Sequence, residues 1–177
     1  MTKEQALERL RSRCSRAEYC SGQIAETLRR WIGRGAGRLP VASVAEGEAL
    51  QLCESDIPGI ISQLKAEKFI DDSRFAAAFV RDKLKFNGWG SQKILYKLRS
   101  FGIDSAIINA AISENCNNVD EGALSGRDVL EKLLVKKWKS LKEGEPLQNR
   151  KSKVIRFAAG RGFEYGEIMA ALEKIIK

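Results

Sequence analysis

The sequence has no histidine, and only three of its 177 residues are prolines. Without histidine, the chain cannot form a histidine-based nucleophile–base pair or a zinc site with a histidine ligand. It also lacks any run of 18 or more apolar residues, so we expect no transmembrane helix. Together with an aromatic content of only 7%, the scarcity of proline argues against a turn-rich β-sandwich.

The four cysteines, Cys14, Cys20, Cys53 and Cys116, form no CxxC pair, which a cysteine metal site or a dithiol redox motif would use. The N-terminus is charged and lacks the apolar stretch of a signal peptide, so we expect a cytoplasmic protein with four free thiols. The phosphate-binding sequence GxxxxGK[ST] is also absent, which excludes ATP binding through that loop.

Basic residues outnumber acidic ones by 31 to 23, for a net charge of +8, while 44% of the residues are hydrophobic. The hydrophobic share is enough to bury a core, and the positive excess favours an acidic partner such as nucleic acid. A basic but otherwise ordinary surface is the alternative explanation of the charge.

Apolar residues recur at helical spacing along the chain, most clearly over residues 71–114. There, Asp71 and Asp72 offer N-cap oxygens to a helix that reaches about residue 85. A second helix follows Ser91 and ends at Gly102, and a third begins directly afterwards. This part of the sequence therefore predicts three short helices joined by tight turns.

The same three-helix pattern occurs three times. Residues 93–112 match residues 153–172 at a constant offset of 60. The helix that precedes residue 93 matches the helix that precedes residue 153 at an offset of 54. A weaker N-terminal copy matches the second repeat at an offset of 70. The predicted repeats are 1–70, 71–117 and 118–177. The first has an insertion at about 33–55, which includes a possible short helix over 43–53, and the third has a loop insertion around 143–148.

A three-helix repeat of this size buries little core alone, so neighbouring repeats should stack. The sequence therefore predicts an all-α protein of tandem three-helix repeats, stacked into an elongated, curved molecule whose concave side could grip something long.

Basic residues of the second and third repeats occupy corresponding positions, at the end of the first helix, in the turn and at the start of the second helix. Such a basic stripe would suit phosphates, so we predict binding to DNA or to a DNA filament there. The residues are Arg81, Lys83, Lys85, Lys93, Lys97 and Arg99 in the second repeat, and Lys136, Lys137, Lys139, Lys153 and Arg156 in the third.

Three aromatic residues lie near this stripe, and aromatic rings can stack on unpaired bases. We favour a core position for Trp138, because it corresponds to Leu84 in the preceding repeat. For Trp89, which stands between two glycines, a turn role and a ligand-binding role both stay open, and Tyr96 lies on the helix that follows.

The adjacent carboxylates of Asp71 and Asp72 could hold Mg²⁺ in a nuclease. No further acidic ligands are evident in the sequence, and helix capping explains the pair more simply.

The segment FIDDSRFA over 69–76, followed by FVRDK over 79–83, resembles the signature of the RecX family of recombination regulators. The next segment, WGSQKILYKLRSFGI over 89–103, resembles the second repeat of that family, and the residues around Leu10 resemble its first helix. The insertion over 33–55 and the diverged third repeat depart from the family pattern.

The resemblance implies a curved all-α molecule of tandem three-helix repeats that modulates the RecA recombinase, usually by inhibiting it. Such proteins bind within the groove of the RecA–DNA filament, also bind single- and double-stranded DNA, are not enzymes and need no cofactor. We therefore expect a monomeric, non-enzymatic regulator of homologous recombination and DNA repair that inhibits RecA ATP hydrolysis and strand exchange. The alternatives are a general DNA-binding helical-repeat protein that does not act on RecA, and the nuclease.

Overall fold

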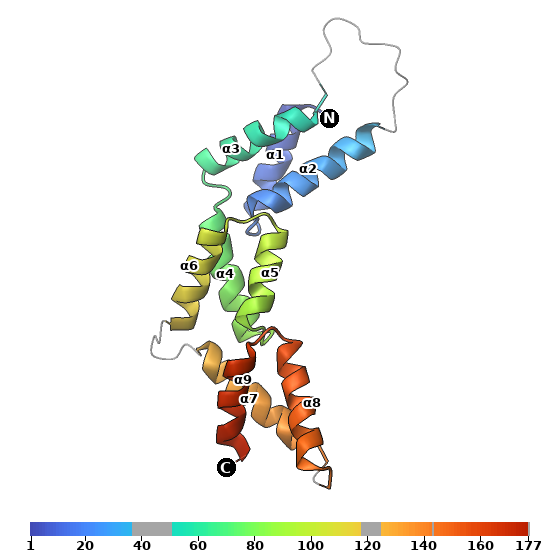
Figure 1. Cartoon of the computed structure of the whole chain (residues 1–177). Helices are drawn as coiled ribbons and strands as arrows, with labels where there is room; N and C mark the ends of the chain where they lie inside the picture. Colours follow the sequence, from blue (N-terminus) through green and yellow to red (C-terminus); the bar gives the residue numbers. More distant parts are fainter. Residues whose placement is uncertain (37–50, 118–124, 143, 177) are drawn as a thin grey trace, which may run out of the picture. The chain divides into compact units, whose positions relative to one another are not determined.

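The computed structural model describes residues 1–36, 51–117, 125–142 and 144–176. Within these ranges the chain forms nine α-helices, one 3₁₀ helix (η1) and no strand, which confirms the all-α prediction. The elements are α1 (Lys3–Cys14), α2 (Ser21–Ala36), η1 (Glu54–Asp56), α3 (Ile57–Ala66), α4 (Asp72–Lys85), α5 (Ser91–Ser100), α6 (Ser105–Asn117), α7 (Gly126–Lys139), α8 (Leu147–Ala159) and α9 (Tyr165–Ile176) (Figure 1).

The helices recur at the offsets found in the sequence. Both ends of α7 keep the expected offset from the ends of α4, and the start of α9 keeps the expected offset from the start of α6. At the N-terminus, the starts of α2 and α5 are related in the same way. We call α1–α3, α4–α6 and α7–α9 the first, second and third repeats.

The two insertions differ in part from the prediction. The loop expected from Gly33 onward begins later, because α2 continues to Ala36. Most of the short helix expected over 43–53 lies outside the described residues, and its last three positions are not helical. In the third repeat α8 begins at Leu147, directly after Pro146, so the end of the predicted loop is helical.

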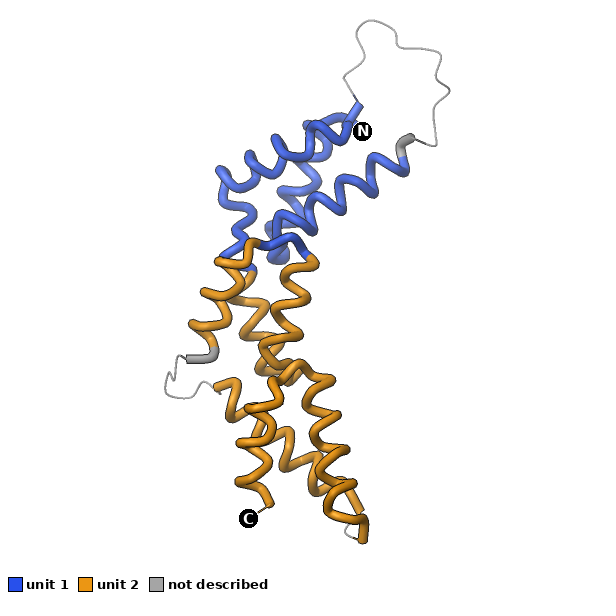
Figure 2. The backbone as a smooth tube through the Cα atoms, viewed as in Figure 1, with its two compact units in different colours: residues 1–75, 101–103 blue, residues 76–100, 104–177 orange. Residues whose placement is uncertain are grey.

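By its contacts the chain divides into two compact units (Figure 2). Unit 1 comprises residues 1–75 and 101–103, and unit 2 comprises residues 76–100 and 104–177. In unit 1, α1, α2 and α3 bury one apolar core, and the largest fully buried side chains on these helices are Leu10, Ile24, Leu28, Ile60 and Leu64.

The start of α2 is fixed by two other parts of unit 1. Asp72 accepts hydrogen bonds from the backbone N–H and the hydroxyl of Ser21, both at 2.7 Å. The turn before α6 lies against the same place, since a Cβ atom on Gly22 would lie 1.7 Å from the carbonyl oxygen of Phe101. Phe101 also packs edge-on against Phe75, with 6.0 Å between the ring centroids.

In unit 2, the third repeat has its own apolar core between α7, α8 and α9. Leu134, Val154 and Ile168 are fully buried in it. In the part of the second repeat that belongs to this unit, Val80, Ile94, Leu98 and Ile108 are equally buried. Both repeats therefore bury their apolar stripes and leave the basic residues of the same helices near the surface.

Candidate nucleic-acid and filament interface

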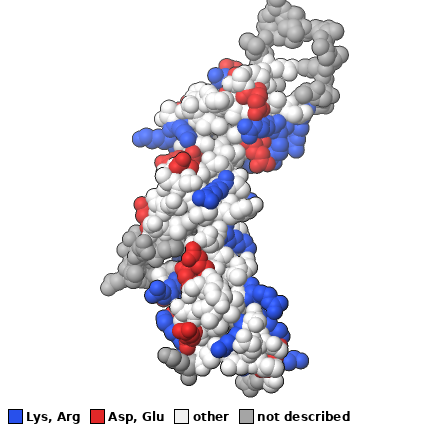
Figure 3. Space-filling model, in the orientation of Figure 1, with Lys and Arg blue, Asp and Glu red and all other residues white. Residues whose placement is uncertain are grey.

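All eleven predicted contact residues lie in unit 2, on α4, α5, α7 and α8. Eight of them are exposed, and the exceptions, Lys83, Lys93 and Lys137, are partly buried. In Figure 3, Lys and Arg side chains gather over α8, whereas acidic side chains lie over the neighbouring α9. Most of the predicted basic residues thus reach the surface of unit 2.

Trp89 holds two of the predicted contact residues by cation–π interaction. The Nζ atom of Lys93 lies 4.7 Å from the Trp89 ring centroid, and that of Lys83 lies 5.5 Å from it. Phe79 meets the same ring edge-on at 6.4 Å and is itself 5.2 Å from the Lys83 Nζ atom. Gly88, with φ at +58°, makes the turn before it, so Trp89 both completes a turn and orders two ammonium groups.

A corresponding pair occurs in the first repeat. The guanidinium of Arg13 lies 4.7 Å from the ring centroid of Tyr19. The offset that relates the first repeat to the second places Arg13 opposite Lys83 and Tyr19 opposite Trp89, so the two pairs occupy equivalent positions. The sequence signal for this pair is an aromatic residue two positions before the serine that opens α2 and α5, but the contact of that ring with a basic residue is not evident from the sequence.

The third repeat arranges its aromatic residues differently. Lys137, the equivalent of Lys83, lies 5.5 Å from the ring centroid of Phe157, and the guanidinium of Arg161 lies 4.8 Å from it. Trp138 packs against the core, as predicted, but Arg150 covers its ring at 4.2 Å.

Lys153 forms an ion pair with the carboxylate of Glu145. Glu145 precedes Pro146 and α8, and its side chain is only 21% exposed. This pairing competes with any phosphate for the Lys153 ammonium, and the sequence does not reveal it because Glu145 lies in a diverged loop.

Arg161 joins the third repeat to the turn that carries Trp89. Its Nη1 atom donates to the carbonyl oxygen of Asn87 at 2.7 Å, and its own carbonyl oxygen accepts from the N–H of Gly90 at 2.8 Å. These contacts fix the basic residues at the start of α5 relative to those of α8. Nothing in the sequence marks this link, because its partners are 74 residues apart.

The acidic pair at the start of α4 is used in two different ways. Asp71 caps α4, since its Oδ1 atom accepts from the N–H groups of Ser73 at 2.8 Å and Arg74 at 3.0 Å. Asp72 instead binds Ser21 and forms an ion pair with Lys65 at 2.8 Å. Burial raises the pKa of Asp72, but these hydrogen bonds outweigh it and the net pKa lies below its ordinary value.

The described residues hold no group of three or more acidic or cysteine side chains placed to bind a metal ion. Cys14, Cys20 and Cys53 are free thiols, and burial raises the pKa values of Cys14 and Cys20. A raised pKa lowers the thiolate fraction at neutral pH, so these two thiols are poor nucleophiles. The side chain of Cys116 lies outside the described part of the structure.

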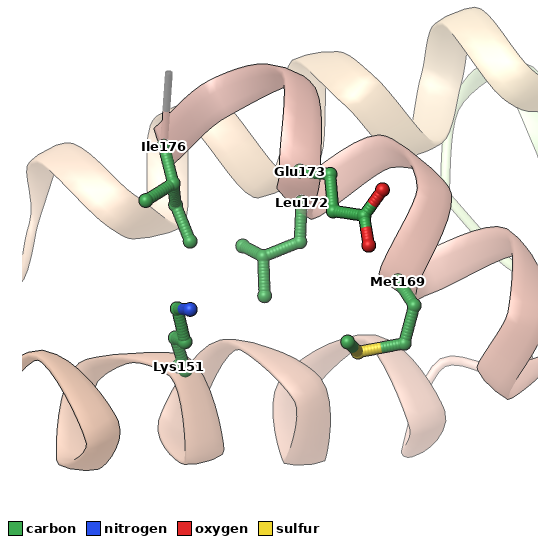
Figure 4. Close-up of a pocket in the computed structure, with 5 residues that line it drawn as sticks. All are labelled: Lys151, Met169, Leu172, Glu173 and Ile176. Atoms are coloured by element: carbon green, nitrogen blue, oxygen red, sulfur yellow. The ribbon is translucent and has the colours of Figure 1, made fainter.

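One cavity of about 260 Å³ lies between α8 and α9 (Figure 4). Its lining is mostly apolar, with one ammonium and one carboxylate, and consists of Lys151, Met169, Leu172, Glu173 and Ile176. It brings no nucleophile together with a base, as a catalytic pocket would. Over the described ranges, every helix is too short or too polar to cross a membrane.

Comparisons with known proteins agree with the three-helix repeats of the fold. Residues 71–112 match the family model described as "RecX, second three-helix domain", and residues 127–172 match "RecX, third three-helix domain". The chain is 33% identical to the regulatory protein RecX of Clostridium tetani over 121 residues, which is 68% of this chain and 52% of that protein. It is 30% identical to the regulatory protein RecX of Bacillus licheniformis over 125 residues, which is 70% of this chain and 44% of that protein.

The chain therefore spans about half the length of the curated relatives it matches. Among solved structures, RecX from Lactobacillus salivarius shares its fold, with a TM-score of 0.74 at 17% identity over 97% of this chain and 95% of that one. A second crystal structure, of a regulatory protein RecX, gives a TM-score of 0.69 at 21% identity over 97% of this chain and 70% of that one. With two RecX domains matched in consecutive order and RecX relatives aligned along two thirds of its length, the chain belongs to the RecX family.

Proposed function

We propose that this chain binds the RecA–DNA filament as a monomer, and that it restrains RecA ATP hydrolysis and strand exchange without catalysing a reaction. Its relatives are named regulatory proteins. The resemblance of the sequence to the RecX family implies RecA as the partner. The observation that carries the proposal is the placement of basic residues at corresponding positions of two consecutive repeats, with Lys83 and Lys93 in one and Lys137 and Lys153 in the next.

A ligand with a regularly repeated negative charge suits this placement. A DNA backbone or a helical protein filament offers the same group again at each step, so two linked repeats can bind together more tightly than either does alone. Contacts of this kind to phosphate give affinity without reading the base sequence.

Binding of this kind can slow RecA if it favours one state of the filament. A ligand shifts a conformational equilibrium only through its different affinities for the states involved. A chain that bridges neighbouring RecA protomers would stabilise the state it bridges, and each round of ATP hydrolysis would have to break those contacts.

The test adds the purified chain to RecA on single-stranded DNA and follows ATP hydrolysis. We expect the rate to fall as the concentration of the chain rises. An unchanged rate with the chain at equimolar or higher concentration would contradict the proposal.

Charge reversal then tests the surface. Combining Lys93→Glu with Lys153→Glu should weaken the inhibition more than either change alone. The matched control combines Arg127→Glu with Lys132→Glu, which alters the net charge equally on the first half of α7, outside the predicted contact residues. If the control weakens inhibition as much as the test variant, overall charge rather than this surface is responsible.

A second candidate function is general DNA binding that does not involve RecA. The cluster of Lys83, Trp89 and Lys93 favours it, because basic and aromatic side chains together suit nucleic acid. It predicts a steep salt dependence of DNA affinity together with no effect on RecA ATP hydrolysis.

A further inference from the structure

Tyr96 is the most exposed large hydrophobic residue among those the structure describes. It lies on α5 with 76% of its surface accessible, and it makes no hydrogen bond or ring contact with another described residue. Phe86, 75% exposed, follows the end of α4 in the same repeat. The Lys85 ammonium lies 5.5 Å from the Phe86 ring centroid, whereas the Tyr96 ring has no such partner in the described part of the chain and is free to stack on a base.

The neighbours of Tyr96 are basic. Lys93 stands three residues before it and Arg99 three residues after it, and residues at this spacing are adjacent on a helix surface. Lys93 is in turn held 4.7 Å from the Trp89 ring centroid. Tyr96 is therefore bordered along α5 by two cations, one of which is ordered by a second aromatic ring.

This arrangement occurs in only one repeat. The positions equivalent to Tyr96 are Glu26 in the first repeat and Arg156 in the third. Tyr165, another exposed tyrosine, opens α9 beside two carboxylates, those of Glu164 and Glu167. Tyr96 thus combines exposure with a basic setting, whereas Tyr165 has exposure alone.

We infer that Tyr96 stacks on an unpaired base of single-stranded DNA while Lys93 and Arg99 contact the phosphates beside that base. The inference rests on the DNA contact in the proposed function and adds a basis for discrimination. Phosphates are present in single strands and in duplexes, but only an unpaired base offers a free face to a ring. Tyr96 therefore makes the second repeat favour single strands.

The experiment measures affinities for a labelled single-stranded oligonucleotide and for a duplex, at one fixed salt concentration. Tyr96→Ala should weaken single-strand binding about fivefold or more, the effect expected for losing one stacked base. Its duplex affinity should change less than twofold. Tyr96→Phe keeps the ring and should bind as the wild type does.

Two controls isolate stacking from charge and from folding. An oligonucleotide of abasic sites keeps the phosphates but has no bases, so the wild type and Tyr96→Ala should bind it equally. Tyr165→Ala removes another exposed ring, outside the basic region, and should leave all affinities unchanged. Circular dichroism confirms that both alanine variants stay helical.

Several outcomes would overturn the stacking role. One is that Tyr96→Ala loses affinity equally for single strand and duplex. Another is that its loss of affinity persists on the abasic oligonucleotide, and a third is that the wild type binds no oligonucleotide. Reduced inhibition of RecA by Tyr96→Ala with unchanged DNA affinity would mean that the ring contacts protein instead. The proposed function is judged separately, because it fails only if the wild type leaves RecA ATP hydrolysis unchanged.

Discussion

A Cβ atom on Gly90 would lie 2.3 Å from the carbonyl oxygen of Gly162, so the backbones of the second and third repeats touch at this point. Two hydrogen bonds accompany the contact, from Gly90 N–H to the carbonyl of Arg161 at 2.8 Å and from Gln92 N–H to that of Gly162 at 3.1 Å. The turn before α9 thereby supplies acceptors to amide groups at the start of α5 that have no partner within that helix.

The same relationship recurs within unit 1. There Gly22, near the start of α2, meets the carbonyl oxygen of Phe101 in the turn before α6. In both places the turn between the second and third helices of one repeat closes on the start of the second helix of the repeat before it. Small residues are required at these points, because no side chain fits between the two backbones.

We predict that Gly90→Ala destabilises the protein by roughly 1–3 kcal/mol, the usual cost of forcing atoms into a packed site. The neighbouring atoms are backbone and are tied by hydrogen bonds, so they cannot move aside as a flexible side chain would. Urea denaturation followed by circular dichroism measures the change in the free energy of unfolding.

Gly166→Ala is the matched control. A Cβ atom on Gly166 would meet no other atom within 4 Å, and the residue lies in the first turn of α9. This variant should be as stable as the wild type or more stable by up to about 1 kcal/mol, since alanine favours helices over glycine. If Gly90→Ala matched it in stability, the close contact of the two repeats would be contradicted.

The helices of this protein could be predicted from the sequence because their causes are local. Apolar spacing, the N-cap at Asp71 and the glycines that end helices all act within a few residues of one another, and φ is +74° at Gly102 and +87° at Gly162. The offsets between repeats follow from these signals. By contrast, the sequence predicts that Asp72 caps its own helix, but Asp72 binds Ser21, which is 51 residues away.

In the candidate site, too, the features with local signals in the sequence could be predicted, and the contacts between distant residues could not. Its basic residues could be found by comparing repeats, because charge at equivalent positions is visible in the sequence. What restrains each of them could not be found. The interaction of Lys83 and Lys93 with one ring, and the pairing of Lys153 with Glu145, depend on how turns of unequal length fold back.

Glu67 makes folding sensitive to acid. Arg11 donates to it at 2.8 and 2.5 Å, and with a further hydrogen bond from Gln63 this lowers the pKa of Glu67 from 4.5 to about 2. The unfolded chain therefore binds a proton that the folded chain does not between about pH 4.5 and pH 2. The stabilisation is complete above this window and is lost as the pH falls through it.

We therefore predict that Glu67→Gln is less stable than the wild type at neutral pH and that the difference shrinks towards pH 2. Urea denaturation at a series of pH values measures it. Glu173→Gln serves as the control, because Glu173 has no ion pair among the described residues, and its difference from the wild type should stay nearly constant. A Glu67→Gln difference that stays constant down to pH 2 would contradict the role of the Arg11 contact.

The ion pair between Lys153 and Glu145 leads to the last prediction, which concerns DNA affinity. Glu145→Gln releases the Lys153 ammonium, so binding to single-stranded DNA should tighten about two- to fivefold at moderate salt, the range expected for a partly exposed ion pair. Because one more cation then reaches the phosphates, the logarithm of affinity should also fall more steeply with the logarithm of salt concentration.

Removing a carboxylate also raises the net charge, and Glu173→Gln separates that general effect from the release of Lys153. It changes the charge equally on α9 of the same repeat and should alter affinity less than Glu145→Gln does. Lys153→Gln supplies the second test. In that variant Glu145→Gln has no Lys153 ammonium to release, so it should lose most of its effect on affinity. If Glu145→Gln tightens binding equally with and without Lys153, the ion pair does not control access to this residue and the gain is due to net charge alone.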